Sequence, residues 1–429
     1  MKNYRVHASH LSAIASIPSS KSQSIRAILF ATLANGMSTI ENALNSPDIV
    51  AMISACRQLG AEIQQHGNQL LIKGVNGCPN TPDDVIDSGN SGQVLRFIAC
   101  LAGLQNQYIV LTGDASIRHS RPVKPLLEAL PALGMTCESM RGDGYAPLII
   151  KGPFKGDSTS LSGEDSQPVS GLLMALAFKA GTTTIRVRDP GEKPWIGLTL
   201  KWLERFQVPY QHHNFEEYQI TGKATIPGFS YRVPGDLSSL SYPLVAAIIT
   251  QSEIVIRDID MTEPQGDKAI VAVLQKMGAK IQINESDNSL SVAKTEALQG
   301  IEVDVNDFID CITIIAVVGC FASGTTKITG AGIARRKESD RITAIRQELQ
   351  KMGASIEELP DGLIVHQSQL HAAEVKSHHD HRIAMSLAVA AMASTGETVI
   401  HDIQCVQKSF PNFAGIMQSL GASISVDES

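Results

Sequence analysis

Residues 276–294 read KMGAKIQINESDNSLSVAK, and the pattern in this stretch returns along the whole chain. A helix-like amphipathic run ends just before Gly278, and two alternating, strand-like runs follow it, separated by a polar turn. A glycine directly after the last residue of a helical run is typical of a helix C-cap. The stretch therefore predicts a helix followed by a β-hairpin.

Five other stretches show the same order of helix end and hairpin, namely residues 58–74, 132–152, 205–223, 351–367 and 419–426. The pattern is marked at Gly60, Gly134, Phe206, Gly278, Gly353 and Gly421, and the unit at Phe206 lacks the glycine. A spacing of about seventy residues is too long for a solenoid repeat. We therefore expect several compact α/β subdomains, each unit containing about two helices and three or four strands.

The composition is that of a soluble globular protein with more than one domain. The chain has 429 residues, and 43% of them are hydrophobic, which is enough to bury more than one core. The formal net charge of -7 argues against nonspecific binding of nucleic acid, which favours basic proteins. An anionic ligand would therefore have to be bound by local clusters of cations.

The cysteines and the apolar runs indicate a cytoplasmic protein. The seven cysteines are scattered and form no CxxC pair, so we expect neither a disulfide framework nor a zinc site. The N-terminal stretch lacks the continuous apolar segment of an export signal. The longest apolar run, residues 311–322, is too short to cross a bilayer. We expect no membrane association.

Polar and charged side chains gather where the expected helices begin. In residues 19–26, SSKSQSIR, Lys21 stands in the first turn of the expected helix. Free N–H groups and the positive end of the helix dipole make such a start suitable for phosphate or carboxylate. Equally, Ser19 or Ser20 can be an ordinary N-cap, with Lys21 and Arg26 on a solvated face. This stretch alone does not separate the two interpretations.

Other helix starts leave similar alternatives. Gly89 and Gly92 permit a close approach of an anion to the backbone, but they also fit a plain helix start. Asp310 can be a simple helix cap. Residues 377–382, SHHDHR, contain three histidines without the spacing of a known metal motif, so we expect no metal. The chain has no GxGxxG, GxxxxGK[ST] or GxSxG, and thus no motif for dinucleotide binding, P-loop chemistry or serine hydrolysis.

Taken together and in order, these segments resemble the EPSP synthase family of enolpyruvyl transferases. The matching motifs are PSSKSQSIR (18–26), GNSGQVLRF (89–97), SRPVKPL (120–126), DSQPVSGLLMA (165–175), RRKESDRI (335–342), DHRIAMS (380–386) and KSFPNF (408–413). The resemblance implies an α/β fold of two domains, each an inside-out barrel of three βαβαββ repeats. It places these domains at residues 19–235 and at residues 1–18 plus 236–429.

The resemblance also implies the reaction. The enolpyruvyl group of phosphoenolpyruvate is transferred to the 5-hydroxyl of shikimate 3-phosphate in the shikimate pathway, and phosphate is released. Such a reaction needs groups that give and take protons beside cations that stabilise charge. No metal or organic cofactor is implied. We expect a monomer whose partners are the two small-molecule substrates and whose two domains close when shikimate 3-phosphate binds.

By the same resemblance, three groups of residues carry the function. Shikimate 3-phosphate would be bound by Lys21, Ser22, Arg26, Ser166, Gln167, Asp310 and Lys337. Phosphoenolpyruvate would be bound by Lys21, Gly92, Arg121, Gln167, Arg341, Arg382 and Lys408. The catalytic candidates are Asp310 as the base at the 5-hydroxyl, Glu338 for proton transfer at the phosphoenolpyruvate carbon, and His381 and Lys21 in support. We also expect Lys21→Met to abolish turnover without loss of stability.

The chain departs from the family pattern at three positions. Asp165 replaces the first of two serines, and an acid beside a phosphate is repulsive unless it points away. Trp195 stands where the family has a stacking tyrosine, and Gln93 where threonine is usual. The last change leaves the response to the family's inhibitor glyphosate open.

Two rival functions share part of this pattern. The sister enzyme that transfers enolpyruvyl to UDP-N-acetylglucosamine shares the architecture but uses a mobile-loop cysteine, which residues 113–122 lack. A noncatalytic scaffold that binds polyanions would keep the cations. It would have no need of Asp310 and Glu338 beside them.

Overall fold

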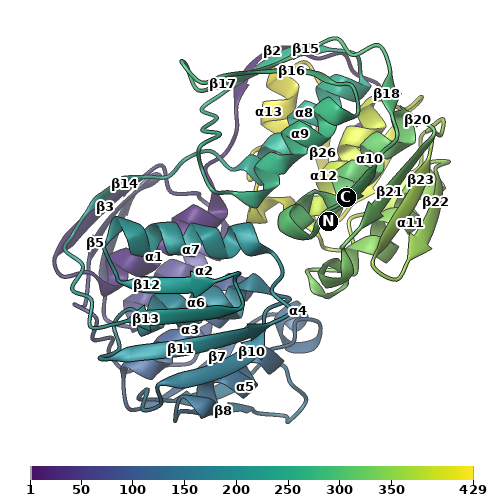
Figure 1. Ribbon diagram of the computed structural model, residues 1–429. Helices are drawn as coiled ribbons and strands as arrows, with labels where there is room; N and C mark the ends of the chain where they lie inside the picture. The colour runs from purple at the N-terminus through teal and green to yellow at the C-terminus, as the bar shows by residue number, and fades with distance from the viewer. Residues whose placement is uncertain (1, 429) are drawn as a thin grey trace. The chain divides into compact units, whose positions relative to one another are not determined.

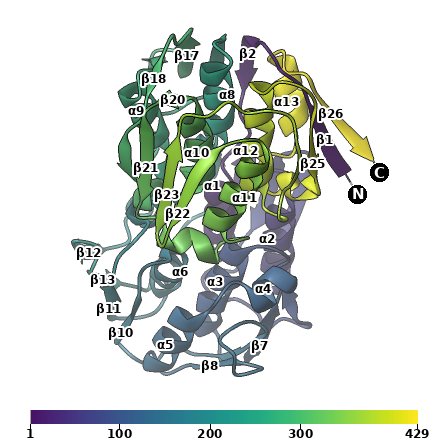
Figure 2. The same cartoon turned by 90° about the vertical axis from the view of Figure 1, so that its right-hand side faces the viewer.

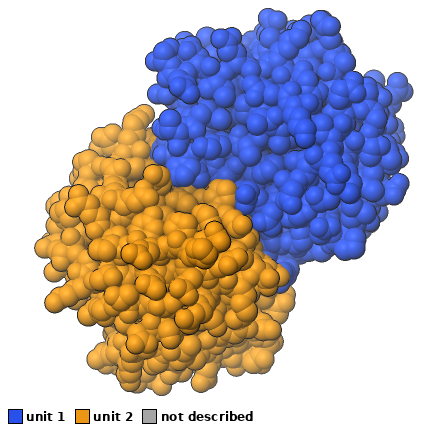
Figure 3. Space-filling view, viewed as in Figure 1, with its two compact units in different colours: residues 1–18, 234–429 blue, residues 19–233 orange. Residues whose placement is uncertain are grey.

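The computed structural model describes residues 2–428, which fold as two compact units. Unit 1 contains residues 1–18 and 234–429, and unit 2 contains residues 19–233 (Figure 3). The chain passes from one unit to the other next to Pro18 and again next to Pro234. The domain boundaries predicted from the sequence lie at residues 18 and 235. That each unit is an enolpyruvyl transferase domain remains a prediction.

Unit 2 has its most buried helices in the interior and its sheets on the outside, as Figure 1 shows. The helices are α1 (Lys21–Leu33), α2 (Pro47–Gln58), α3 (Gly92–Leu101), α4 (Ala115–His119), α5 (Lys124–Ala132), α6 (Ser166–Leu176) and α7 (Lys193–Arg205), with a 3-10 turn η1 (Ala102–Leu104). Helices α1, α3 and α6 are buried on almost every side, and α3 packs directly on α6. Because α3 and α6 lie side by side, their starts can bring polar groups together.

Three four-stranded sheets surround these helices. They are β14 (Ser230–Arg232), β3 (Met37–Glu41), β5 (Gln69–Lys73) and β4 (Glu62–His66); β6 (Ile86–Asp87), β7 (Tyr108–Thr112), β9 (Leu148–Lys151) and β8 (Thr136–Ser139); and β10 (Ser158–Ser162), β11 (Thr182–Arg188), β13 (Glu217–Thr221) and β12 (Tyr210–His213). Buried and exposed residues alternate along several of these strands, such as β3 and β11, as in a sheet with one face on the core.

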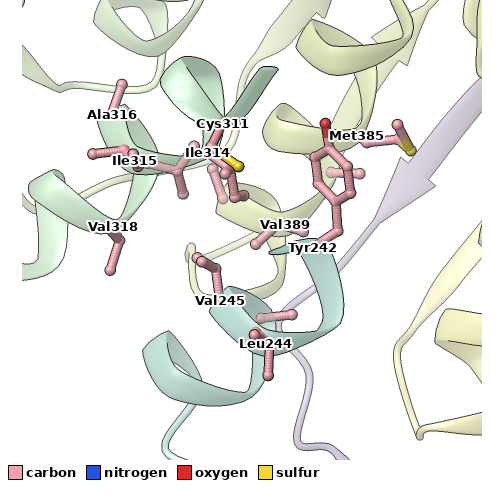
Figure 4. Packing of buried hydrophobic residues seen from close by; sticks show 14 of the residues in the cluster. Tyr242, Leu244, Val245, Cys311, Ile314, Ile315, Ala316, Val318, Met385 and Val389 are labelled. Atoms are coloured by element: carbon pink, nitrogen blue, oxygen red, sulfur yellow. The ribbon is translucent and has the colours of Figure 1, made fainter. Parts of the chain in front are cut away.

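Unit 1 repeats this arrangement with its own elements. Its helices are α8 (Leu237–Ile249), α9 (Ala269–Lys276), α10 (Ile312–Phe321), α11 (Arg341–Lys351), α12 (His381–Met392) and α13 (Phe413–Ser419), and its 3-10 turns are η2 (Gly266–Lys268), η3 (Asn306–Cys311), η4 (Gly332–Arg336) and η5 (Ile403–Lys408). Figure 4 shows buried side chains of α8, α10 and α12 meeting in its core, including Tyr242, Ile314 and Met385. Burial of each large apolar side chain stabilises the fold by about 1.5–3 kcal/mol.

The sheets of unit 1 draw on both ends of the chain. They are β2 (Ser12–Ser16), β15 (Glu253–Arg257), β17 (Ser289–Ala293) and β16 (Lys280–Asn284); β19 (Glu302–Asp304), β21 (Thr325–Thr329), β23 (Gly362–His366) and β22 (Ser355–Leu359); β24 (Glu374–Lys376), β25 (Thr398–His401), β1 (Lys2–Val6) and β26 (Ile424–Glu428); and the pair β18 (Leu298–Gln299) and β20 (Ala322–Ser323). Figure 2 shows β1 between β25 and β26.

All six four-stranded sheets of the described chain have the same order of pairing. A parallel pair comes first, and two antiparallel pairs follow it. The sheets of unit 1 repeat this order. The fold is therefore a mixed α/β fold with six small sheets of one design.

The glycine marks of the sequence lie where the preceding helices end. Gly60, Gly134, Gly278, Gly353 and Gly421 all have positive φ angles, between 81° and 104°. Such angles are easy for glycine and costly for most other residues. In the sixth unit the mark at Phe206 is wrong by one position, because Gln207 has the positive φ angle of 53°. The sixth unit thus keeps the turn without the glycine.

Two further findings concern the membrane and the thiols. Within residues 2–428, no helix is both long and apolar enough to span a membrane. The seven cysteines are all free thiols, and five of them are buried.

Candidate functional site

The start of α1 carries the first predicted substrate cation. Of the two possible caps, Ser20 is the N-cap, and its hydroxyl accepts a hydrogen bond from the backbone N–H of Gln23 at 3.4 Å. Lys21 Nζ lies 3.5 Å from Asp48 Oδ2, in the first turn of α2. The neighbouring Ser22 hydroxyl accepts a hydrogen bond from the Gln93 side chain at 3.1 Å. Lys21 therefore has an anionic partner inside unit 2.

Arg26 is buried, with 1% of its surface exposed, so the solvated-face interpretation of its position is wrong. It donates to the Thr199 hydroxyl at 2.9 Å, to the backbone carbonyls of Ser22 and Trp195 at 3.1 and 3.0 Å, and to the Ser170 hydroxyl at 3.5 Å. Among its hydrogen-bond partners in residues 2–428 none is a carboxylate. Burial lowers the pKa of Arg26 to about 9. A buried guanidinium with neutral partners favours the arrival of an anion.

Three polar side chains converge on the start of α3. A Cβ atom at Gly92 would lie 2.5 Å from Arg96 Nη1, 3.2 Å from Gln167 Oε1 and 3.3 Å from Arg121 Nη1. Arg96 Nη1 also donates to Gln167 Oε1 at 3.0 Å. Any residue with a side chain at position 92 would have to displace them. The structure thus brings together three residues predicted to bind phosphoenolpyruvate, Gly92, Arg121 and Gln167.

Arg121 is held in place by the loop before α3. Its Nη1 donates to the backbone carbonyl of Asn90 at 3.1 Å, and its Nη2 donates to the Asn90 side-chain oxygen at 3.0 Å. The Asn90 side chain in turn donates to Asp114 Oδ2 at 2.5 Å. A guanidinium oriented in this way is suited to an oxyanion.

Two carboxylates lie at the start of α6. Asp165 is the N-cap and accepts from the backbone N–H of Gln167 at 3.0 Å, and its Oδ2 lies 3.1 Å from Arg96 Nη2. The acid that replaces the family's serine is therefore paired with a cation. The backbone N–H and the hydroxyl of Ser166 both donate to Glu192 Oε2 at 3.0 Å.

A second cluster, in unit 1, is centred on Arg341, the first residue of α11. Its Nη1 donates to Asp310 Oδ1 at 2.7 Å, its Nη2 to Glu338 Oε2 at 2.9 Å and its Nε to Asp380 Oδ2 at 2.8 Å. Burial alone would lower the pKa of Arg341, but Asp380, Glu338 and Asp310 hold it above its usual range. One buried cation is thus shared by three carboxylates.

Asp310 joins this cluster to α12. Its Oδ2 accepts from Arg382 Nη2 at 3.0 Å. Burial alone would raise the pKa of Asp310, but Arg382, Arg341 and then Lys337 hold it well below its usual range. Asp310 is therefore ionised and is more than the helix cap that the sequence also allowed. On its own, so weakly basic a carboxylate is a poor general base.

Glu338 joins the cluster to η5. Its Oε1 lies 2.5 Å from Lys408 Nζ, so Glu338 bridges Lys408 and Arg341. His381 Nδ1 lies 3.6 Å from Asp380 Oδ1, and both side chains are buried. All seven residues of unit 1 named from the resemblance therefore lie in or beside one charged cluster: Asp310, Lys337, Glu338, Arg341, His381, Arg382 and Lys408.

The structure adds three residues to the candidate site, Asp380, Arg96 and Glu192, to which the sequence assigned no role. Asp380 is the N-cap of α12, and it also accepts a hydrogen bond from the Ser339 hydroxyl at 3.1 Å. Arg96 follows Gly92 by four residues, and this helical spacing was a signal that its side chain would reach the start of α3. Glu192 stands three residues before Trp195 and had no signal of its own.

Two of the three histidines in residues 377–382 lie against separate carboxylates. His378 Nε2 lies 2.7 Å from Glu348 Oε1, on α11, and His381 lies beside Asp380. Within residues 2–428, no three side chains of His, Cys, Asp or Glu are placed together to hold a metal ion.

Asp267, in η2, is a buried acid near this cluster. Its Oδ2 accepts a hydrogen bond from the Ser238 hydroxyl. Burial and then the charge of Asp310 raise its pKa to about 7, against opposing effects of Arg382 and Ser238.

This raised pKa predicts a pH-dependent stability. Between about pH 4 and pH 7, folded Asp267 keeps a proton that the unfolded chain releases, so its contribution to stability falls as the pH rises. Asp267→Asn cannot ionise. We therefore expect the free energy of unfolding of Asp267→Asn to rise relative to wild type as the pH is raised from about 5 to 8. Between the pKa of Asp267 in the unfolded chain and its pKa in the folded protein, this difference should grow by at most about 1.4 kcal/mol per pH unit.

Urea denaturation at several pH values measures this difference. Asp307→Asn, at an exposed aspartate of η3, is the matched control, and its difference from wild type should not follow the same course. Curves for wild type and Asp267→Asn that run parallel from acid to alkaline pH would show that Asp267 does not titrate in this way.

The chain is similar to known proteins over almost its whole length. The family model described as EPSP synthase (3-phosphoshikimate 1-carboxyvinyltransferase) matches residues 7–417. The chain is 41% identical over 426 residues to the 3-phosphoshikimate 1-carboxyvinyltransferase of Chlamydia caviae, covering 99% of this chain and 95% of that protein. It is 39% identical to the enzyme of the same name from Ruminiclostridium cellulolyticum, covering 98% and 99%.

Solved structures show the same fold. EPSP synthase from Acinetobacter baumannii superposes with a TM-score of 0.83 at 26% identity, over 100% of both chains. The enolpyruvyl transferase NikO from Streptomyces tendae has a TM-score of 0.78 at 17% identity, over 100% of this chain and 99% of that one, which speaks for the fold alone. Because the family model and relatives of 39–41% identity span almost the whole sequence, the chain belongs to the EPSP synthase (3-phosphoshikimate 1-carboxyvinyltransferase) family.

Proposed function

We propose that the chain transfers the enolpyruvyl group of phosphoenolpyruvate to the 5-hydroxyl of shikimate 3-phosphate, with release of phosphate. The end-to-end match to the EPSP synthase family is the observation that carries this function. The charged clusters at the helix starts of both units suit two polyanionic substrates, because guanidinium and ammonium groups form charge-assisted hydrogen bonds to phosphate and carboxylate.

Residues of unit 2 are proposed to bind both substrates. Lys21, Ser22 and Arg26 hold shikimate 3-phosphate together with Ser166 and Gln167. Arg26 is the strongest support for this assignment, because it is a buried cation whose hydrogen-bond partners are neutral groups. Gly92 and Arg121 bind phosphoenolpyruvate along with Lys21 and Gln167, where the absence of a side chain at Gly92 lets the guanidinium groups of Arg96 and Arg121 come close to the backbone.

In unit 1, Arg341, Arg382 and Lys408 are proposed to bind phosphoenolpyruvate. These cations already contact Asp310 and Glu338, so the substrate has to share or replace those contacts. An anionic substrate that engages Arg341 and Arg382 weakens their hold on Asp310 and so raises its pKa. Binding of the substrate would therefore make Asp310 a stronger base for the step in which the 5-hydroxyl loses its proton.

The proton steps follow from these positions. Asp310, which with Lys337 also binds shikimate 3-phosphate, takes the proton of the 5-hydroxyl as that oxygen attacks the central carbon of phosphoenolpyruvate. Glu338, with His381 and Lys21 in support, passes a proton from solvent to the methylene carbon, and a tetrahedral intermediate with a methyl group results. Loss of phosphate and of one methyl proton then forms the enolpyruvyl ether. Each of the three proton transfers requires a group within hydrogen-bond reach of the reacting atom.

The repeat architecture, the oligomeric state, the cellular location and the domain closure remain predictions. We propose that each unit is an inside-out barrel of three βαβαββ repeats, which the six sheets of one design support. That the protein acts as a cytoplasmic monomer, and that shikimate 3-phosphate closes the two domains, are likewise predictions. Small-angle scattering with and without this substrate tests the closure, since the radius of gyration should fall.

Phosphate release tests the proposed function. Purified protein with phosphoenolpyruvate is expected to release phosphate when shikimate 3-phosphate is added, and not when UDP-N-acetylglucosamine is added instead. Release with the second acceptor would assign the chain to the sister activity. No release with either acceptor would leave a polyanion-binding scaffold as the better account.

A further inference from the structure

The first residue of α6 directs two hydrogen-bond donors to one internal carboxylate oxygen. Both the backbone N–H and the hydroxyl of Ser166 lie 3.0 Å from Glu192 Oε2. Ser166 is 3% exposed and Glu192 is 2% exposed, so this is an interior contact. At the next residue, the backbone N–H of Gln167 donates to Asp165. Carboxylates of the protein thus already occupy the first two N–H groups of α6.

Glu192 is held in a specific conformation just before α7. Its φ and ψ angles of 48° and 38° place it in the left-handed region, which residues other than glycine rarely adopt. Its backbone carbonyl accepts from the N–H of Trp195 at 3.0 Å. The Trp195 carbonyl in turn accepts from Arg26 at 3.0 Å. The segment that carries Glu192 therefore also contacts a second residue proposed to bind shikimate 3-phosphate.

We infer that Glu192 sets the affinity for the phosphorylated acceptor, whose phosphate can reach the two donors of Ser166 only by displacing the Glu192 carboxylate. The inference rests on the proposed function, in which Ser166 binds shikimate 3-phosphate. Two anions at the same pair of donors repel each other, and such like-charge contacts weaken binding. Glu192 therefore lowers the affinity for shikimate 3-phosphate and makes phosphate binding depend on a movement of the Glu192 side chain.

Glu192→Gln tests this inference. The amide keeps the size of the side chain and an oxygen that can accept from Ser166, but it removes the negative charge. We expect the KM for shikimate 3-phosphate to fall roughly tenfold, because one like-charge contact is removed. The KM for phosphoenolpyruvate and kcat should stay within about threefold of wild type, since the two carboxylates proposed for proton transfer lie in unit 1. Glu216→Gln makes the same charge change at an exposed position of unit 2 and should leave all three values unchanged.

A second variant controls for the possibility that the glutamine amide still accepts the hydrogen bonds of Ser166 and so competes with the phosphate. Glu192→Ala removes the acceptor altogether, and it should lower the KM for shikimate 3-phosphate at least as much as Glu192→Gln, with circular dichroism showing a folded protein. If the KM for shikimate 3-phosphate is unchanged or raised in folded Glu192→Gln and Glu192→Ala, the inference is wrong and Glu192 is structural. Failure of the proposed function is a different result, because wild type and Glu216→Gln would then show no turnover with shikimate 3-phosphate at all.

Discussion

Replacing Lys21 by methionine is expected to lower turnover of phosphoenolpyruvate and shikimate 3-phosphate by roughly 10³-fold or more, because one cation proposed to contact both substrates is lost. Methionine keeps much of the length and apolar character of the lysine chain, so the packing of α1 is preserved. Phosphate release under saturating substrates measures the effect. Lys73→Met, at an exposed lysine of the same unit that also pairs with an acid, is the matched control and should keep wild-type turnover.

The expected effect of Lys21→Met on stability differs from the sequence-based prediction. The lysine pairs with Asp48, which is 3% exposed and would lose a cationic partner in the variant. Loss of such a partner costs about 1–3 kcal/mol. We therefore expect a modest drop in stability, which Asp48→Asn in the same chain should reduce. Near-normal turnover in a folded Lys21→Met protein would contradict the assigned role.

Replacing Asp310 by asparagine is expected to lower kcat by about 10²–10⁴-fold, the usual contribution of a general base. The KM for phosphoenolpyruvate should not rise, because Arg341 and Arg382 each lose a competing carboxylate in the variant. Steady-state kinetics with each substrate varied in turn separates these two parameters. This split distinguishes a base from a residue that merely holds the arginines, since loss of a pure positioning contact would raise the KM for phosphoenolpyruvate.

Asp307→Asn is the matched control for this experiment. Asp307 lies in the same 3-10 turn, but it is exposed. Its replacement should leave kcat within about twofold of wild type. If Asp310→Asn also kept kcat within about fivefold, Asp310 would not be the base, and another acceptor would be needed for the proton of the 5-hydroxyl.

The repeating secondary structure was predictable because its signals are local. Alternating apolar residues define the hairpins, and a glycine follows most of the helices that precede them. Each unit can therefore be recognised from about twenty consecutive residues. The sequence did not predict the turn at Gln207, because a glutamine does not indicate a positive φ angle. The pairing of β1 with β25 and β26 joins residues nearly the whole chain apart, and no local pattern carries that information.

The charged residues of the site were predictable in part. The resemblance named Arg341 and Asp310 as separate ligands, one for each substrate. It did not reveal that they contact each other at 2.7 Å, because such a contact depends on the packing of α11 against its neighbours. Arg341, Arg382 and Lys408 are therefore already paired with carboxylates. Arg26 is the clearest case of a cation whose hydrogen bonds go to neutral groups.

Turnover in D2O tests the central claim most directly, because the proposed addition and elimination pass through an intermediate with a methyl group. The chain is expected to convert phosphoenolpyruvate and shikimate 3-phosphate into phosphate and an enolpyruvyl ether in equal amounts, seen by phosphorus NMR. Proton NMR should show deuterium in the vinyl group of that ether. Release of phosphate without the ether, or an ether with no deuterium in its vinyl group, would contradict the proposed chemistry.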